Sequence, residues 1–157
     1  MARPVAPVAT WARITTLLLS LAGLGLSTYL TIEHFGHSNL LVCPHNTLFN
    51  CLSVTTSAQS YFFGIPVAVL GLVSFLVMTA LNTPWAWNAK QYWLHVARFV
   101  LAIGSMGFVL WLIAAELVII DHICLYCTAV HFITFVLLIV LTQVSPKQLG
   151  WVSRSAN

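Results

Sequence analysis

The chain has 157 residues, of which 60% are hydrophobic and only 6% are charged. Soluble domains carry roughly 25% charged residues, so this composition excludes a soluble globular protein and indicates an integral membrane protein. The net charge of +3 is not gathered into a basic patch with interleaved aromatic side chains, which argues against nucleic-acid binding. The length suits one membrane domain over residues 1–157.

Four apolar runs follow one another along the chain, over about residues 11–32, 62–81, 94–120 and 123–144. Each is close to the roughly 20 residues that a membrane-spanning helix needs, and none alternates in the manner of a β-barrel strand. The first run is too long and continuous for a signal peptide, and Ser145-Pro146 is expected to stop the fourth. The sequence therefore predicts an all-α bundle of four transmembrane helices. Small residues are expected at its helix contacts, namely Gly23, Gly25, Gly104 and Gly107.

Charged residues indicate how the bundle is oriented. All basic residues lie near the two chain ends, between the second and third runs, or near the start of the third run: Arg3, Arg13, Lys90, Arg98, Lys147 and Arg154. The positive-inside rule then predicts that both termini are cytoplasmic. The acidic residues lie toward the opposite side: Glu33, Glu116 and Asp121. Glu116 falls within the third run, and an acid inside a membrane is a functional candidate, here for a proton relay.

This topology places all the cysteines on the non-cytoplasmic side, where disulfides persist. Cys43 and Cys51 lie in the first outer loop, whereas Cys124 and Cys127 form a Cys-x-x-Cys pair at the start of the fourth helix. A disulfide restrains the chain most when it closes a long loop, and a Cys-x-x-Cys bridge closes a very short one. That spacing is typical of reactive dithiols.

Each cysteine pair also has a helix start beside it, where free amides and the helix dipole favour a thiolate. Asp121 is expected to cap the fourth helix, and Asn50 is expected to cap a short outer-loop helix that begins at Cys51. Two such pairs suit relayed thiol–disulfide exchange. Two structural disulfides are an alternative, and so is a zinc site built from Cys43, His45, Cys51 and the later pair. Haem attachment is excluded because Thr128, not histidine, follows Cys127.

Beyond these local features, the chain resembles the vitamin K epoxide reductase (VKOR) family over nearly its whole length. The resemblance rests on the loop pair "CPHNTLFNC" followed by "LSVTTS", on "FFGIPVAVLG", and on "AAELVIIDHICLYCTAV". It implies an enzyme that couples disulfide formation to reduction of a membrane quinone (menaquinone, ubiquinone or a vitamin K-type quinone), without a metal. Electrons are expected to pass from a thioredoxin-fold partner through Cys43 and Cys51 to Cys124 and Cys127, and on to the quinone.

The resemblance also assigns residues to the quinone. Ser57 corresponds to the family's serine that hydrogen-bonds a quinone carbonyl, and Phe62 or Phe63 is expected to line the ring pocket. His131 stands where some relatives carry tyrosine, and its imidazole could still bond a carbonyl. The stretch between Cys51 and Phe63 is shorter than in vertebrate members, and we expect the thioredoxin-like partner to be a separate protein, not a fused domain.

These departures point to a bacterial form in the cytoplasmic (inner) membrane, with the active site facing outward. The endoplasmic reticulum membrane is the alternative, and reduction of an epoxide stays open. A DsbB-type quinone reductase is the nearest alternative enzyme, although it normally carries its Cys-x-x-Cys in the first outer loop. A non-catalytic Cys/His metal-binding membrane protein is the alternative outside enzymes.

Overall fold

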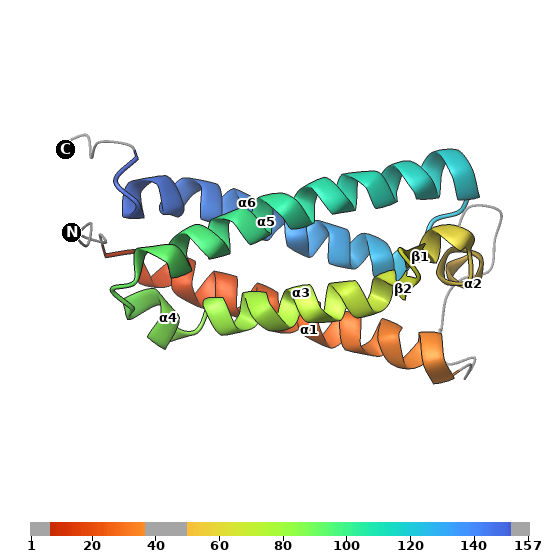
Figure 1. Ribbon diagram of the computed structural model, residues 1–157, viewed down its shortest axis with the longest axis horizontal. Coiled ribbons are helices and arrows are strands. Elements are labelled where there is room, and N and C mark those ends of the chain that lie inside the picture. Colours follow the sequence, from red (N-terminus) through yellow and green to blue (C-terminus); the bar gives the residue numbers. More distant parts are fainter. Residues whose placement is uncertain (1–6, 37–49, 152–157) are drawn as a thin grey trace.

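The computed structural model describes residues 7–36 and 50–151, and it is an elongated helical bundle (Figure 1). The long helices α1 (Thr10–Gly36), α3 (Val67–Leu81), α5 (Tyr92–Ala114) and α6 (Leu125–Gln148) run along the long axis. Short elements close the two ends. They are α2 (Cys51–Thr55), the 3-10 turn η1 (Ala58–Ser60), the hairpin β1 (Tyr61–Phe62) and β2 (Ile65–Pro66), α4 (Pro84–Asn88) and the π-helix η2 (Ala115–Ile120).

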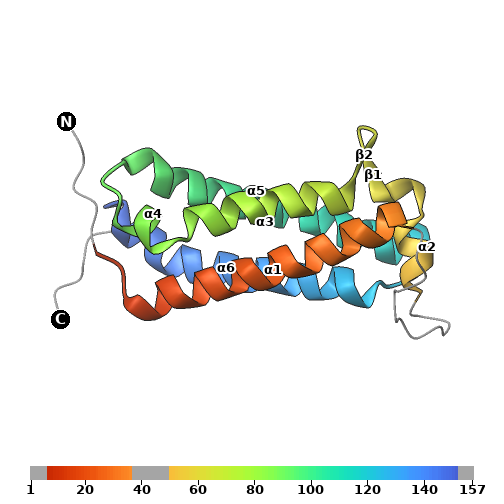
Figure 2. The ribbon, with the colours of Figure 1, turned by 90° about the horizontal axis from the view of Figure 1, so that it is seen from below.

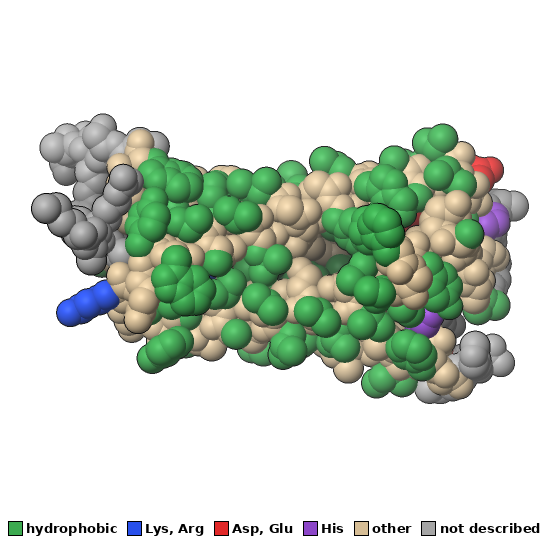
Figure 3. Space-filling model, in the orientation of Figure 1, with side chains coloured by type: hydrophobic (Ala, Val, Ile, Leu, Met, Phe, Trp, Pro, Cys, Tyr) green, Lys and Arg blue, Asp and Glu red, His purple; other side chains and the backbone are tan. Residues whose placement is uncertain are grey.

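Within these described ranges, three helices are long and apolar enough to cross a membrane: residues 10–36, 92–120 and 125–148. Helix α3 is a shorter apolar helix of 15 residues, or roughly 22 Å at 1.5 Å per residue. Large apolar side chains cover the outside of the bundle (Figure 3), which is the surface that a hydrocarbon solvent favours. The protein is thus a helical membrane protein, as the composition predicts.

The second long helix begins at Val67, not at Phe62 as predicted. The residues before it form a hairpin in which Tyr61 pairs with Pro66 and Phe62 with Ile65. The turn places Phe63 at φ 50° and Gly64 at φ 80°, a left-handed geometry typical of two-residue hairpins. The hairpin projects from the side of the bundle (Figure 2). An apolar run of this length cannot by itself distinguish a strand from a helix.

The junction between the third and fourth helices also differs from the prediction. Helix α5 passes into the π-helix η2, which ends at Asp121 in the left-handed conformation, at φ 55°. Asp121 therefore ends one helix and does not cap the next, because Cys124 is the N-cap of α6. Helix α6 continues past Ser145 through Pro146 to Gln148. A proline this close to a helix end removes few backbone hydrogen bonds, so the predicted stop is wrong.

The two ends of the bundle carry opposite charges. The starts of α1 and α5, the end of α6 and α4 lie at one end, and α2, the hairpin and the start of α6 lie at the other (Figure 1). Arg13, Lys90 and Lys147 belong to the α4 end, and Glu33, Glu116 and Asp121 to the α2 end. The basic and acidic surfaces visible in Figure 3 are at opposite ends accordingly.

Arg98 differs from the other described basic residues because it is fully buried. Its Nε donates to the carbonyl of Leu81 at 2.9 Å, and its guanidinium lies 3.5 Å from the ring centre of Trp87. A second guanidinium nitrogen donates to His95 Nδ1 at 3.3 Å, which leaves His95 Nε2–H to donate to Ala89. The guanidinium therefore provides a hydrogen-bond donor for the carbonyl of Leu81, the last residue of α3. A positive charge is favourable at this end of a helix.

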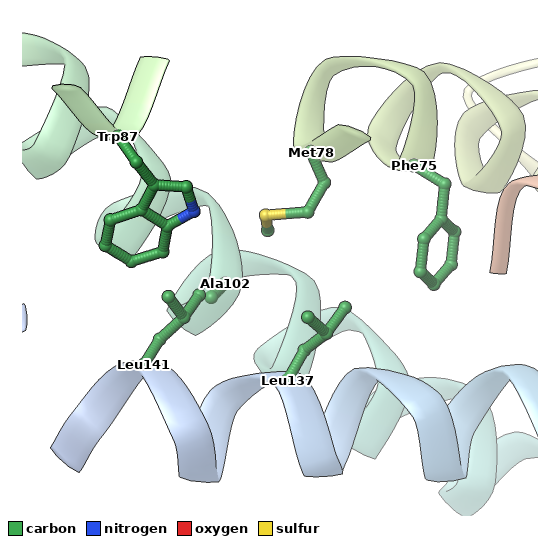
Figure 4. Packing of buried hydrophobic residues seen from close by; sticks show 6 residues of the cluster. All are labelled: Phe75, Met78, Trp87, Ala102, Leu137 and Leu141. Carbon is green, nitrogen blue, oxygen red and sulfur yellow. The ribbon is translucent and has the colours of Figure 1, made fainter. Parts of the chain in front are cut away.

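Trp87, which the Arg98 guanidinium covers, also belongs to the main core cluster. Phe75 and Met78 of α3 face Leu137 and Leu141 of α6, with Ala102 of α5 and Trp87 of α4 beside them (Figure 4). Of the glycines expected at helix contacts, only Gly23 has a close neighbour, since a Cβ there would lie 2.1 Å from the Phe75 ring. A Cβ at the others, Gly25, Gly104 and Gly107, would meet nothing within 4 Å.

Candidate functional site

Helix α2 holds Cys51 against the end of the bundle. Asn50 caps this helix as predicted, because its side chain accepts a hydrogen bond from Ser53 N at 3.1 Å. The backbone N–H of Asn50 donates to the carbonyl of Ile123 at 3.2 Å, so the start of α2 is bonded to the segment that leads into α6. Cys51 is fully buried and disulfide-bonded. Its predicted partner in the relay, Cys43, lies outside the described residues.

The tertiary structure brings Cys51 together with the Cys-x-x-Cys pair. Cys51, Val54 and Cys124 form one buried cluster, against which Tyr126 and Cys127 pack. Both Cys51 and Cys124 have no exposed surface, and Cys124 and Cys127 are free thiols. A sulfur of the loop helix and a sulfur of the fourth helix thus share a pocket from which water is excluded.

Cys124 and Cys127 interact with each other at the start of α6. As the N-cap residue, Cys124 accepts a hydrogen bond from Cys127 N at Sγ, 3.4 Å away. The hydrogen bond with the Cys127 side chain holds the pKa of the Cys124 thiol below its ordinary value, and burial opposes this effect. A thiol with a lowered pKa is a better participant in disulfide exchange because the thiolate is the reactive form.

A cavity of about 160 Å³ begins at Cys127 and extends into the bundle. All the long helices contribute to its lining, and α2 and η1 close it at the outer end. Most of the wall is apolar, with a few polar side chains among aliphatic and aromatic ones, as in sites for small organic ligands. Three of these polar groups, Ser57, Glu116 and His131, are residues that the sequence indicated.

Ser57 lies at the outer end of this cavity. Its hydroxyl donates to the carbonyl of Val54 at 2.8 Å, so bonding a ligand carbonyl requires the hydroxyl to turn away from Val54. The neighbouring Gln59 also lines the cavity and was not identified from the sequence, because nothing in a short polar loop shows which side chain points inward.

The two phenylalanines expected at the ring pocket do not line the cavity. The Phe63 side chain is 91% exposed at the tip of the hairpin. Phe62 lies with its ring centre 5.2 Å from that of Phe108 and 5.9 Å from that of Trp111. Phe108 does line the cavity, so Phe62 supports the wall from outside. Both phenylalanines lie outside the cavity because a hairpin replaces the helical turn expected at these positions.

Glu116 lies in η2 and His131 lies in α6. Both line the cavity, and both also line a second, shallower groove between these helices. Glu116 lies in the π-helix, with the backbone amide of Cys124 within hydrogen-bonding reach of its carboxyl group. His131 is only 7% exposed, and no described residue hydrogen-bonds its ring. π-Helical turns are frequent at functional sites, and this one directs an acid toward the thiols.

Over residues 7–36 and 50–151, no group of three or more His, Cys, Asp or Glu side chains is arranged to hold a metal ion. Cys43 and His45, which belong to the zinc alternative, lie outside these residues.

Residues 14–142 match the family model described as "Vitamin K epoxide reductase family". The matched segment covers most of the chain and contains both cysteine pairs, Ser57, Glu116 and His131.

Proposed function

Because the chain belongs to the vitamin K epoxide reductase family, a family of quinone-linked redox enzymes, we propose that it generates disulfides at the expense of a membrane quinone. The electron donor is the dithiol of a thioredoxin-fold protein outside the cytoplasm. The electrons pass through Cys43 and Cys51 to Cys124 and Cys127, and then to the quinone.

A thiolate of the partner attacks the Cys43–Cys51 disulfide, and the second partner thiol completes the partner's disulfide, which leaves both loop cysteines reduced. The Cys51 thiolate then attacks Cys124 in the Cys124–Cys127 disulfide, and Cys127 leaves as a thiolate. When Cys43 re-forms the disulfide with Cys51, both electrons reside on the Cys124–Cys127 pair. That pair reduces the quinone to the hydroquinone with two protons and returns to the disulfide.

One observation carries this proposal: the thiols lie in the order that the relay needs. Cys51 is packed with Cys124 in a buried cluster, Cys124 accepts a hydrogen bond from Cys127 N, and Cys127 lines the cavity. The lowered pKa of Cys124 supports its role as the sulfur that exchanges with Cys51.

Quinone reduction consumes two protons, and Glu116 is suited to relay them. Glu116 and His131 both line the cavity that Cys127 lines. We assign Glu116 to proton relay and His131 and Ser57 to the quinone carbonyls. Phe62 and Phe63 have no part in the ring pocket in this proposal, since neither lines the cavity.

The charge separation supports an orientation with the α4 end in the cytoplasm and the cysteine end outside. A bacterial cytoplasmic membrane offers both a quinone pool and an oxidising outer face, and the endoplasmic reticulum is the alternative. A separate thioredoxin-fold protein is the partner. Menaquinone, ubiquinone and vitamin K-type quinones all present the two carbonyls that the site requires.

Single-cysteine variants test the relay by anaerobic assay with a reduced thioredoxin-fold protein and, separately, a small dithiol. Cys127→Ala should abolish quinone reduction by either donor. Cys43→Ala should block the protein donor yet retain reduction by the small dithiol, which can reach the inner pair without the loop disulfide. Ser145→Ala, a buried substitution at the opposite end, is the matched control and should keep both activities. Full-rate oxidation of the protein donor by the Cys43 variant would overturn the relay.

A further inference from the structure

Deeper in the cavity, α3 and α5 each contribute a serine. Ser74 and Ser105 both line the cavity, and their hydroxyl oxygens lie 3.1 Å apart. Ser74 follows the first residue of α3 by seven positions, which puts it roughly 10 Å below the outer end of that helix. The pair therefore lies below the level at which α2 and η1 close the cavity.

The bonding of this pair differs from that of other hydroxyls in the bundle. Thr16, Ser20 and Thr134 each donate to a carbonyl of their own helix, the usual way to satisfy a helical hydroxyl. Ser74 and Ser105 bond only each other among the described residues. Two hydroxyls have two protons and several lone pairs, so one shared bond leaves one proton free to donate into the cavity.

A third hydroxyl enters the cavity from α1, about one helical turn nearer the outer end than the serine pair. Ser27 is 2% exposed, lines the cavity and has no hydrogen-bond partner among the described residues. A Cβ on Gly71, three residues before Ser74 on α3, would lie 3.3 Å from the Ser27 oxygen. A buried hydroxyl without a partner is costly in an apolar site, and this one opens onto the same cavity as the serine pair. The Ser27 hydroxyl, which bonds no described residue and faces this apolar cavity, is therefore available to a ligand with oxygen atoms.

The chemistry at this depth selects the kind of ligand atom. The hydroxyls of Ser27, Ser74 and Ser105 are neutral, and the surrounding wall is made of aliphatic and aromatic side chains. Such a site suits a neutral oxygen acceptor on an otherwise apolar molecule, and it does not suit an ionic group. A 1,4-quinone offers two carbonyl oxygens on opposite edges of one ring. With one edge near Cys127, the other edge points down the cavity.

We propose that Ser74 and Ser105 hydrogen-bond the quinone carbonyl farther from Cys127, with Ser27 completing the site. This inference rests on the proposed function and adds a second anchor for the same substrate. The free proton of the pair donates to the carbonyl oxygen, which draws electron density away from the ring and orients its near edge toward the thiols. The ligand class is a lipid-soluble 1,4-quinone. The serine pair contacts only the carbonyl oxygen, so it does not select among ring substituents.

Serine-to-alanine variants of this pair give the first test. Loss of one neutral hydrogen bond corresponds to about a two- to tenfold change in binding, so Ser74→Ala and Ser105→Ala should each raise the KM for quinone by that factor. The increase should be similar for a benzoquinone and a naphthoquinone, because both carry the carbonyl, and the KM for the thiol donor should not change. Ser105→Thr keeps a hydroxyl and should restore the KM. Ser145→Ala, outside the cavity, should leave it unchanged.

The bound quinone gives a readout that does not depend on turnover. Carbon-13 labels on the two carbonyls, one at a time, distinguish their infrared stretching bands. Removing the serine pair should shift one carbonyl band to higher frequency and leave the other in place.

The competing explanation is that the serines only hold α3 against α5, as interhelical hydroxyl bonds do in membranes. A lowered melting temperature with unchanged KM and unchanged carbonyl bands would overturn the proposal in favour of that role. If the unmodified protein reduced no quinone at all, the proposed function itself would fail. If the unmodified protein reduces quinone normally and the serine variants change neither the KM for quinone nor the carbonyl bands, only the second anchor is rejected.

Discussion

Gly23 provides the sharpest test of how the helices pack around the cavity. A Cβ at this position would lie 2.1 Å, 2.4 Å and 2.5 Å from three carbons of the Phe75 ring. Carbon atoms in good contact are about 3.5–4.0 Å apart, so the ring would have to move by roughly 1.5 Å. Phe75 is buried in the core cluster (Figure 4) and also lines the cavity. The ring can therefore move only by entering the cavity or by separating α1 from α3.

We expect Gly23→Ala to destabilise the bundle by about 1–3 kcal/mol, the usual range for an overpacked core. For a protein of this size that corresponds to roughly 2–4 °C of melting temperature per kcal/mol. Alanine also favours the helix by about 1 kcal/mol over glycine, so a control is needed. Gly25→Ala supplies it, because Gly25 is on the same helix, exposed, and its Cβ would meet nothing within 4 Å.

The assay is thermal unfolding of the purified protein in detergent, with Gly23→Ala, Gly25→Ala, Phe75→Ala and the Gly23/Phe75 double variant. Gly25→Ala should melt at or above the parent, whereas Gly23→Ala should melt several degrees below it. In the Phe75→Ala background the penalty at Gly23 should largely disappear, which a double-mutant cycle measures as coupling. A clash with the Phe75 ring is ruled out if Gly23→Ala melts at the same temperature as Gly25→Ala, or if the Gly23→Ala penalty persists in the Phe75→Ala background.

Three further predictions concern the ends of the bundle. Arg98→Met should cost about 2–3 kcal/mol in urea unfolding, because it removes a charged donor and leaves the buried Leu81 carbonyl unsatisfied; stability equal to the parent would contradict this. Asn50→Ala should cost about 1 kcal/mol locally, since the cap on Ser53 N is lost. Its signature is faster amide exchange in residues 51–55 with the long helices unaffected, and uniform exchange would contradict it. Phe63→Gly should stabilise by about 1 kcal/mol, because Phe63 is held at φ 50°. Phe63→Ala keeps the strained backbone geometry. Equal melting temperatures for Phe63→Ala and Phe63→Gly would therefore contradict the expected relief of strain.

The sequence predicts the membrane class and the main helices because these depend on properties of each segment taken alone. An apolar run of sufficient length forms a helix in hydrocarbon, since every backbone group must be bonded within the segment. The Asn50 cap is equally local, because its bond to Ser53 spans only three residues. Motif spacing also indicates two cysteine pairs, and it predicts the family. The match over residues 14–142 confirms the family.

Local signals fail where two segments compete for the same residues. The run that includes Phe62 reads as one helix, yet the Phe63–Gly64 turn pairs Phe62 with Ile65. Asp121 has the right chemistry for a helix cap, but the left-handed turn that ends the π-helix uses it instead. Arg98 counts as a cytoplasmic charge in the sequence, whereas α3 and α4 bury it against Leu81 and Trp87.

Only the tertiary structure decides what surrounds the thiols. The packing of α2 on the start of α6 brings Cys51 beside Cys124, although they are 73 positions apart in the chain. Ser27, Ser74 and Ser105 are unremarkable in sequence because serine is common at helix contacts in membranes. They become candidates for binding only because helices from three parts of the chain turn them toward one cavity. A cavity is a property of how faces meet, and no single segment encodes it.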